Sequence, residues 1–121
     1  MNPREIVEAY LNALGERDYT VVRTLLADEG FVYRSPIANH THADDYVNHV
    51  FMSDGVMQRL EIRKCFVDGN DVCHFLRVHA QISEKITHDL VHWAHVDQGR
   101  IDHIEVLFDA SLYKSFFPAA R

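Results

Sequence analysis

The sequence predicts an α+β domain whose helices precede a curved antiparallel sheet. Apolar residues recur at helical spacing up to Met52, interrupted by one short strand, and alternate with polar residues thereafter. Helices that are segregated in this way from a run of strands pack together on one face of the sheet. A chain of 121 residues is long enough for one domain with a substantial core, so residues 1–121 are expected to form a single unit.

Two helices are expected before the first strand. Asn2 is suited to cap the first helix, because Glu5 follows at the position that completes a capping box. Gly15 favours the end of this helix. Asp18 is suited to cap the second helix, which the breaker at residues 28–30 ends.

A short strand at residues 31–35 and a third helix are expected next. Pro36 ends the strand, since proline cannot donate a hydrogen bond to a sheet. Thr41 and Asp44 resemble a capping box for a helix that runs to about Met52. All the helices up to this point should lie on the concave face of the sheet.

Four long strands are expected in the rest of the chain. Alternation predicts the first two at residues 57–67 and 72–82. Residues 87–109 predict a hairpin of two further strands, whose tight polar turn contains Gly99 in an unusual φ region. A short last helix is expected at residues 110–116.

Strand register decides which of these side chains share the inner face. A turn centred on residues 98–99 pairs three positions across the hairpin: His95 with Asp102, Trp93 with Ile104, and Val91 with Val106. A symmetric turn at residues 83–86 aligns His74 with His95. His74, His95 and Asp102 are therefore predicted to form a row across three strands, with neighbouring Cβ atoms about 5 Å apart.

This row has three interpretations. It is an acid–base relay if the carboxylate orients one imidazole while the other moves a proton. It is a divalent metal site if two imidazoles and a carboxylate serve as ligands. It is an ordinary polar patch if the residues lie at the wet end of the hairpin. We retain the relay as the hypothesis, with no metal and no cofactor.

Composition excludes several partners. The net charge of −6 and the absence of a basic cluster disfavour nucleic acid. No apolar run is long enough to cross a membrane, and the first residues lack the apolar segment of a signal peptide. Only two cysteines occur, Cys65 and Cys73, so no disulfide framework is indicated and a cytoplasmic location is expected.

The chain resembles the nuclear-transport-factor-2-like (NTF2-like) superfamily. The resemblance rests on the order of elements, on Ser35-Pro36, and on the opening AYLNALGERDYTVVRTLLAD and the closing GRIDHIEVLFD. It covers nearly the whole chain and is best with the SnoaL-like group of polyketide cyclases, ketosteroid isomerases and limonene epoxide hydrolases. It implies a cystatin-like fold with a cone-shaped pocket between sheet and helices, and homodimers formed by the outer face of the sheet.

Catalytic residues of the group carry over only in part. Tyr10 matches the tyrosine with which ketosteroid isomerases donate a hydrogen bond to the substrate oxygen. Ser35 stands where those enzymes have the general-base aspartate, and Val91 where they have a second acid. A serine cannot deprotonate a carbon acid unaided. The charged positions of the epoxide hydrolases fall on apolar residues: Val106, Leu76 and Val78.

The expected function is that of a small-molecule pocket protein. The favoured form is a cofactor-independent isomerase, cyclase or hydratase/hydrolase acting on an apolar cyclic or polyketide-like substrate. Tyr10 would polarise an oxygen, His95 or His74 would move a proton, and Asp102 would orient the histidine. The alternative is a non-catalytic ligand-binding or protein-interaction module. The expected ligand-binding residues are Tyr33, Ser35, Tyr46, His49, Val91, Trp93, Ile104, Val106 and Phe108.

Some of these residues also have structural interpretations. Trp93 and His49 suit simple core packing as well as a pocket wall. The spacing of His40 and His42 resembles a metal motif, but helix capping and loop solvation explain it equally.

The convex face is expected to form a two-fold homodimer. Its predicted residues come from three strands: Cys73, Phe75, Arg77 and His79, then Leu90, His92 and Ala94, then His103, Glu105 and Leu107. Phe75, Leu90 and Leu107 would otherwise lie in water. Arg77, His92 and Glu105 are expected to line up in register.

Overall fold

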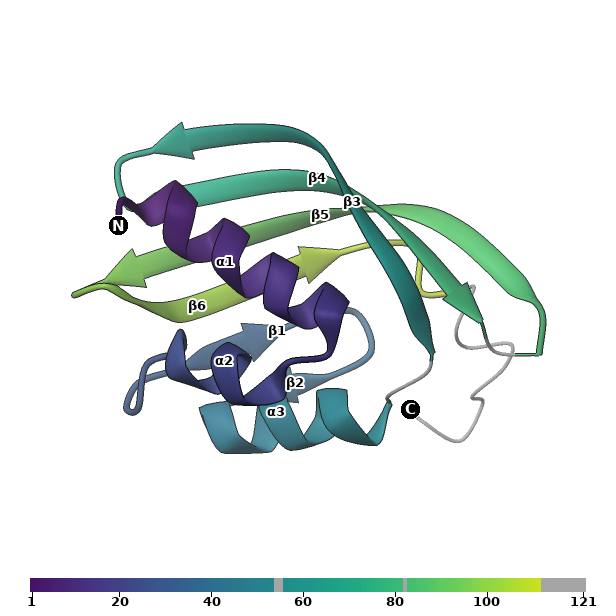
Figure 1. The fold of residues 1–121 in the computed structure, drawn as a ribbon, viewed down its shortest axis with the longest axis horizontal. Coiled ribbons are helices and arrows are strands. Elements are labelled where there is room, and N and C mark those ends of the chain that lie inside the picture. The colour runs from purple at the N-terminus through teal and green to yellow at the C-terminus, as the bar shows by residue number, and fades with distance from the viewer. Residues whose placement is uncertain (54–55, 82, 112–121) are drawn as a thin grey trace.

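The computed structural model describes residues 1–53, 56–81 and 83–111, and shows an α+β fold. Its helices are α1 (Pro3–Glu16), α2 (Tyr19–Thr24) and α3 (Ala43–Met52). Its strands are β1 (Val32–Arg34), β2 (Asn39–His40), β3 (Met57–Asp68), β4 (Asp71–Gln81), β5 (Lys85–Asp97) and β6 (Arg100–Leu107). The curled sheet wraps around α1, while α2 and α3 lie near β1 and β2 (Figure 1). None of the described helices combines the length and the apolar character that crossing a bilayer requires.

The sheet is mixed rather than antiparallel throughout. Its strand order is β2-β1-β6-β5-β4-β3, and the four long strands form the expected antiparallel meander. The short strand β1 pairs in parallel with β6, and the two-residue strand β2, which the sequence did not predict, pairs with β1. The sheet does not close, so β2 and β3 remain its edges.

Capping explains where α1 begins and ends. The Asn2 side chain accepts a hydrogen bond from the Glu5 amide at 2.8 Å, and the Glu5 carboxylate accepts one from the Asn2 amide at 2.9 Å. This capping box confirms the predicted start. Gly15 lies inside the helix, and Arg17 ends it instead, in the left-handed region at φ 60°.

The other two helices begin differently from one another. Asp18 caps α2 as predicted, because its side chain accepts a hydrogen bond from the Val21 amide at 3.2 Å. The N-cap of α3 is His42, which makes no side-chain capping bond, so the capping box predicted from Thr41 does not form. Asp44 instead accepts a hydrogen bond from Arg23 at 2.6 Å and ties α3 to α2. The helix expected at residues 110–116 lies almost wholly outside the described residues.

The β5–β6 hairpin has the predicted turn but not the predicted register. Gln98 and Gly99 both have positive φ, 51° and 79°, as the tight turn requires. Val96 pairs with Ile101, but His95 pairs with His103, so Asp102 is an extra residue in β6. This β-bulge shifts every later pair by one position.

The β4–β5 register also differs from the prediction. Gln81 pairs with Lys85, so the connection is shorter than the symmetric turn that we expected. As a result His74 lies opposite His92 rather than His95. A shift by an odd number of residues exchanges the two faces of a strand, because side chains alternate with a period of two.

The inner face of the sheet follows from these registers. The predicted inner residues of β4 are all buried: Val72, His74, Leu76, Val78 and Ala80. On β5 the buried set is His92, Ala94 and Val96, so the predicted inner set of Val91, Trp93 and His95 was wrong. Trp93 is 38% exposed, and its indole nitrogen donates a hydrogen bond to Asp71 at 2.9 Å.

Candidate functional site

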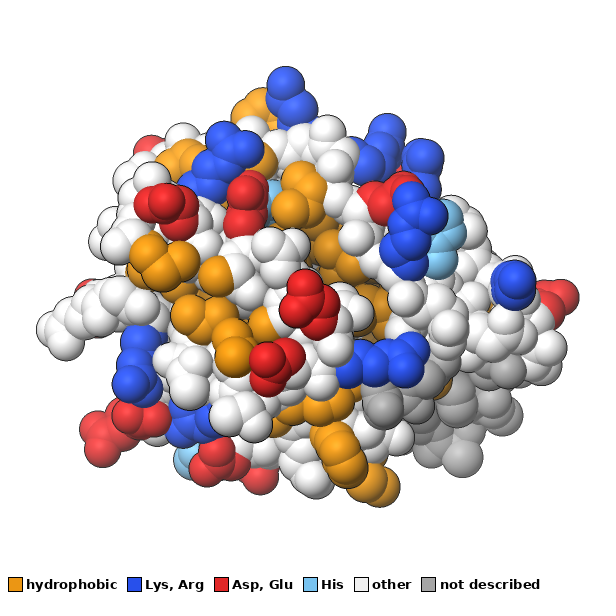
Figure 2. Space-filling model, in the orientation of Figure 1, with side chains coloured by type: hydrophobic (Ala, Val, Ile, Leu, Met, Phe, Trp, Pro, Cys, Tyr) orange, Lys and Arg blue, Asp and Glu red, His pale blue; other side chains and the backbone are white. Residues whose placement is uncertain are grey.

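A cavity of about 230 Å³ lies between the helices and the inner face of the sheet. Six residues predicted from the sequence line it: Tyr10, Tyr33, Tyr46, His49, Val106 and Phe108. Much of the remaining wall is aliphatic and includes Leu11, Leu14, Leu60, Leu76, Val78 and Leu90. On the surface, apolar side chains gather in the hollow alongside α1, with charged side chains around it (Figure 2). The cavity therefore suits a small, mostly apolar ligand.

Seven other predicted site residues lie outside the wall of this cavity: Ser35, Val91, Trp93, Ile104, His74, His95 and Asp102. Ile104 is fully buried in the core. Val91 and Trp93 belong to the outer face of β5, as the corrected register requires.

Ser35 has a structural role in the turn between β1 and β2. Its hydroxyl accepts hydrogen bonds from the amides of Ala38 at 3.1 Å and Ile37 at 3.3 Å. It also lies 3.1 Å from the Ala38 carbonyl, to which it donates. The position at which ketosteroid isomerases have their base thus holds a turn residue in this chain.

Two buried tyrosines form the polar centre of the cavity. The Tyr10 hydroxyl from α1 is hydrogen-bonded to the Tyr46 hydroxyl from α3. Tyr33 stacks on Tyr46 with ring centroids 4.3 Å apart. Burial raises the pKa of Tyr10 and that of Tyr46, so both stay protonated at neutral pH. Only one of the two hydroxyl hydrogens is used between them, which leaves the other for a ligand oxygen.

His92 is a cavity residue that the sequence analysis placed on the opposite face of the sheet. It lines the cavity, is 4% exposed, and its ring centroid lies 5.8 Å from that of Tyr10. Neither ring nitrogen has a hydrogen-bond partner among the described residues. Burial, together with the charge of the neighbouring His74, lowers the pKa of His92 to about 3. At neutral pH it therefore offers one N–H donor and one nitrogen acceptor.

A second pair of histidines lies at the edge of the cavity. His49 from α3 lines it and shares a hydrogen bond of 2.8 Å with His40 from β2. Burial, followed by the charge of His40, lowers the pKa of His49, so this imidazole is neutral at neutral pH. His40 is thus paired with His49, and His42 serves as the N-cap of α3.

The structure does not assemble the predicted row of His74, His95 and Asp102. His95 donates a hydrogen bond to Asp102 at 2.7 Å, but on the outer face, where their side chains are 36% and 30% exposed. This hydrogen bond raises the pKa of His95. His74 lies on the inner face, fully buried, and its Nε2 atom is 2.9 Å from a carboxylate oxygen of Glu8. The bulge at Asp102 and the β4–β5 register separate the two groups.

Solved structures with this fold come from several bacteria. An NTF2-like protein of unknown function from Cytophaga hutchinsonii is 21% identical, with 93% of this chain and 95% of that chain covered and a TM-score of 0.81. An LEH-like epoxide hydrolase from M. tuberculosis is 22% identical, with 94% of each chain covered and a TM-score of 0.78. A protein of ketosteroid isomerase-like fold from Catenulispora acidiphila, solved with trimethylamine, is 17% identical, with 88% and 87% covered and a TM-score of 0.79.

Sequence comparison adds no closer relative. No family model matches the chain, and no curated protein matches it. The structural likeness extends over nearly the whole of each chain at a TM-score of about 0.8, as the values for all three proteins show. The chain therefore has the NTF2-like fold that the sequence resemblance predicted.

Proposed function

We propose that the cavity binds a small, largely apolar molecule through one oxygen atom of that molecule. The observation that carries this proposal is the hydrogen-bonded pair of Tyr10 and Tyr46, buried in a largely apolar wall. One of their hydroxyl groups donates to the ligand oxygen, and the neutral His92 beside Tyr10 offers a second donor. Such an arrangement fits a cyclic or polyketide-like ketone, ester or epoxide.

The same donors support catalysis as an isomerase, cyclase or hydratase/hydrolase without a cofactor. Hydroxyl and imidazole donors that are fixed in a dry cavity stabilise negative charge as it develops on an oxygen. A proton acceptor is also needed, and the neutral His49 is the candidate, because its hydrogen bond to His40 orients the ring. His92 suits donation better, because a pKa of about 3 makes it a weak base.

The second candidate function is binding without catalysis. No carboxylate is found among the described residues that line the cavity, although the related mechanisms carry a carboxylate there. A protein that stores, carries or senses an apolar molecule needs only the shape of the cavity and the tyrosine pair.

Binding is tested with a cyclic ketone and a hydrocarbon of the same skeleton, cyclohexanone and methylenecyclohexane, by calorimetry or ligand-observed NMR. Replacing Tyr10 with phenylalanine should weaken ketone binding about fivefold to tenfold, the value of one hydrogen bond. Binding of the hydrocarbon should not change, because tyrosine and phenylalanine share the same aromatic ring. Native mass spectrometry of the purified protein identifies any molecule that copurifies.

Equal losses for the two ligands would contradict the proposal, since they would show that the substitution had altered the cavity and not a hydrogen bond. Binding of neither ligand by the wild-type protein would contradict the chosen ligand class.

We also propose a two-fold homodimer through the outer face of the sheet. Phe75, Trp93 and Leu107 are 41%, 38% and 57% exposed on this face. Large apolar side chains grouped on one face favour association, because each contributes about 1.5–3 kcal/mol when it is buried. The predicted outer set on β5 was wrong, and Val91, Trp93 and His95 replace Leu90, His92 and Ala94.

The polar contacts on this face also differ from those predicted. The expected line of Arg77, His92 and Glu105 does not form, because His92 is buried on the inner face. Asp89 instead accepts hydrogen bonds from Arg77 at 3.0 Å and from Arg63 at 3.2 Å. These three exposed side chains are available to a partner at the rim of the interface.

Light scattering at micromolar concentration should give the mass of a dimer. Replacing Leu107 with glutamate should give a monomer, since the new charge would be buried in the interface. The control is Val21→Glu, because Val21 is 41% exposed on α2, away from the sheet. A single-chain mass for the wild-type protein, or a dimer that persists in Leu107→Glu, would contradict this interface.

We propose a cytoplasmic location for the protein. Cys65 and Cys73 are both free thiols in the structure, which is the state expected in a reducing compartment.

A further inference from the structure

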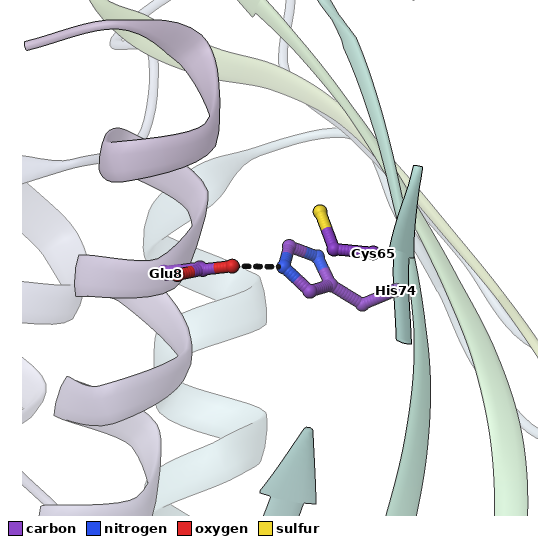
Figure 3. A group of neighbouring side chains, drawn as sticks. All are labelled: Glu8, Cys65 and His74. Atoms are coloured by element: carbon purple, nitrogen blue, oxygen red, sulfur yellow. Dashed lines mark hydrogen bonds and ion pairs between the residues drawn. The ribbon is translucent and has the colours of Figure 1, made fainter. Parts of the chain in front are cut away.

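Three elements bring a carboxylate, a thiol and an imidazole together outside the cavity. Glu8 comes from α1, Cys65 from β3 and His74 from β4 (Figure 3). One potential ligand atom of each residue lies within 4.8 Å of those of the other two. None of the three residues lines the cavity described above.

The fold holds these side chains in place. Cys65 and His74 are paired positions in the β3–β4 ladder, so their side chains leave the sheet on the same face. Glu8 lies above them on α1, and its carboxylate points at the His74 ring (Figure 3). A helix and two paired strands form a rigid support of the kind on which precise ligand geometry depends.

His74 provides a second, independent indication. Its side chain is fully buried, and its Nδ1 atom has no hydrogen-bond partner among the described residues. A buried polar nitrogen without a partner is costly, so its retention in the core requires an explanation. Metal binding through Nδ1 supplies one, because a neutral imidazole binds a metal through either nitrogen.

The donor set indicates the metal. A thiolate, an imidazole and a carboxylate together suit Zn²⁺, and three protein ligands leave one tetrahedral position for water. Bond lengths of about 2.0–2.3 Å place ligand atoms roughly 3.2–3.8 Å apart, so this cluster closes with movements of about 1 Å. The thiolate and the carboxylate balance the charge of the ion.

When a metal binds, the Arg4 side chain must leave Glu8, and the Cys65 thiol must lose its proton. Arg4 lies 3.0 Å from the same Glu8 oxygen that faces His74, and its side chain, 55% exposed, is free to move into water. Only the thiolate binds a metal, so binding releases the Cys65 proton to the solvent. The affinity for metal should therefore increase with pH.

We propose that Glu8, Cys65 and His74 form a binding site for Zn²⁺ with one position open to water. The probe is Co²⁺ added to the untagged protein under reducing conditions, followed by displacement with Zn²⁺. A thiolate-to-cobalt charge-transfer band should appear with one equivalent, together with the intense visible bands of tetrahedral cobalt. Zn²⁺ should abolish both signals.

Variants assign the ligands. Cys65→Ser should remove the charge-transfer band, and Glu8→Gln should weaken the affinity at least about tenfold. Cys73→Ser is the matched control, because Cys73 lies on the opposite face of β4, next to His74 in sequence, and should leave the spectrum unchanged. Zn²⁺ should also raise the melting temperature of the wild-type protein and of Cys73→Ser, but not that of Cys65→Ser.

The absence of a charge-transfer band would overturn the proposal. A band that persists in Cys65→Ser would overturn it as well. So would metal binding that neither Cys65→Ser nor Glu8→Gln weakens, since surface histidines would then be the ligands. Circular dichroism of the variants shows whether they are folded, and the fully buried His74 is left in place for this reason.

Discussion

Acidification should destabilise the protein steeply below about pH 6.5, and replacing His92 with leucine should remove much of this effect. The pKa of His92 is about 3 in the folded protein, against 6.5 for an ordinary histidine. Between these values the unfolded chain binds a proton that the folded protein does not, so stability falls as the pH falls. The full difference corresponds to about 4–5 kcal/mol at pH 3.

The measurement is urea unfolding of both proteins at about pH 7, 6, 5 and 4, from which the free energies of unfolding are compared. Carboxylates with lowered pKa, such as Glu8 and Asp89, act in the same direction, but they are common to both proteins and cancel in the difference. At about pH 7 the imidazole is neutral in the folded and in the unfolded protein, so the two proteins should differ much less in stability than at about pH 4.

His95 provides a control of opposite sign. Its hydrogen bond to Asp102 raises its pKa, so the stability that it contributes is present below the ordinary histidine pKa and is lost as the pH rises through the folded value. His95→Gln should therefore lower stability in acid and have little effect in alkali. Parallel pH curves for the wild-type protein and His92→Leu would refute the buried neutral imidazole.

The second large effect concerns turnover. With a substrate in hand, Tyr10→Phe should lower kcat at least about a hundredfold, the usual effect of removing a donor to a developing oxyanion. Substitutions of His95 and Asp102 should leave kcat within about twofold of the wild-type value, because their hydrogen bond lies outside the cavity. Steady-state kinetics of Tyr10→Phe, His95→Ala and Asp102→Asn provides the comparison.

A hundredfold loss of kcat in His95→Ala or Asp102→Asn would contradict this expectation and show that the outer face takes part in the reaction. Unchanged turnover in Tyr10→Phe would remove the main support for an enzyme, and binding without catalysis would then be the better account of the cavity.

The fold was largely predictable because local signals agree with one another. The caps at Asn2 and Asp18 and the turn at Gln98 and Gly99 were all identified from residue types that act within a few positions. The two-residue strand β2 and the parallel pairing of β1 with β6 carry no comparable signal. Both depend on contacts between distant segments.

The candidate site was predicted less well, for a definite physical reason. Tyr10 and Tyr46 lie on helices, whose inner faces follow from a repeated pattern. His92 and His95 lie on a strand, where one bulge residue or a shorter turn exchanges the faces. The bulge at Asp102 was not visible in the sequence. The contact between Glu8 and His74 joins residues 66 positions apart, and neither position is distinctive alone.

The open edge of the sheet has a consequence for solubility. Because the sheet does not close, the 12 residues of β3 run along an unpaired edge, where Phe66 and Val67 are about half exposed. Such an edge is a template on which another chain can add a strand. Arg63 and Lys64, both exposed beside these apolar residues, oppose that addition, because charged side chains on an edge strand disfavour pairing with another chain. Resistance to aggregation at this edge therefore depends on these two charged side chains.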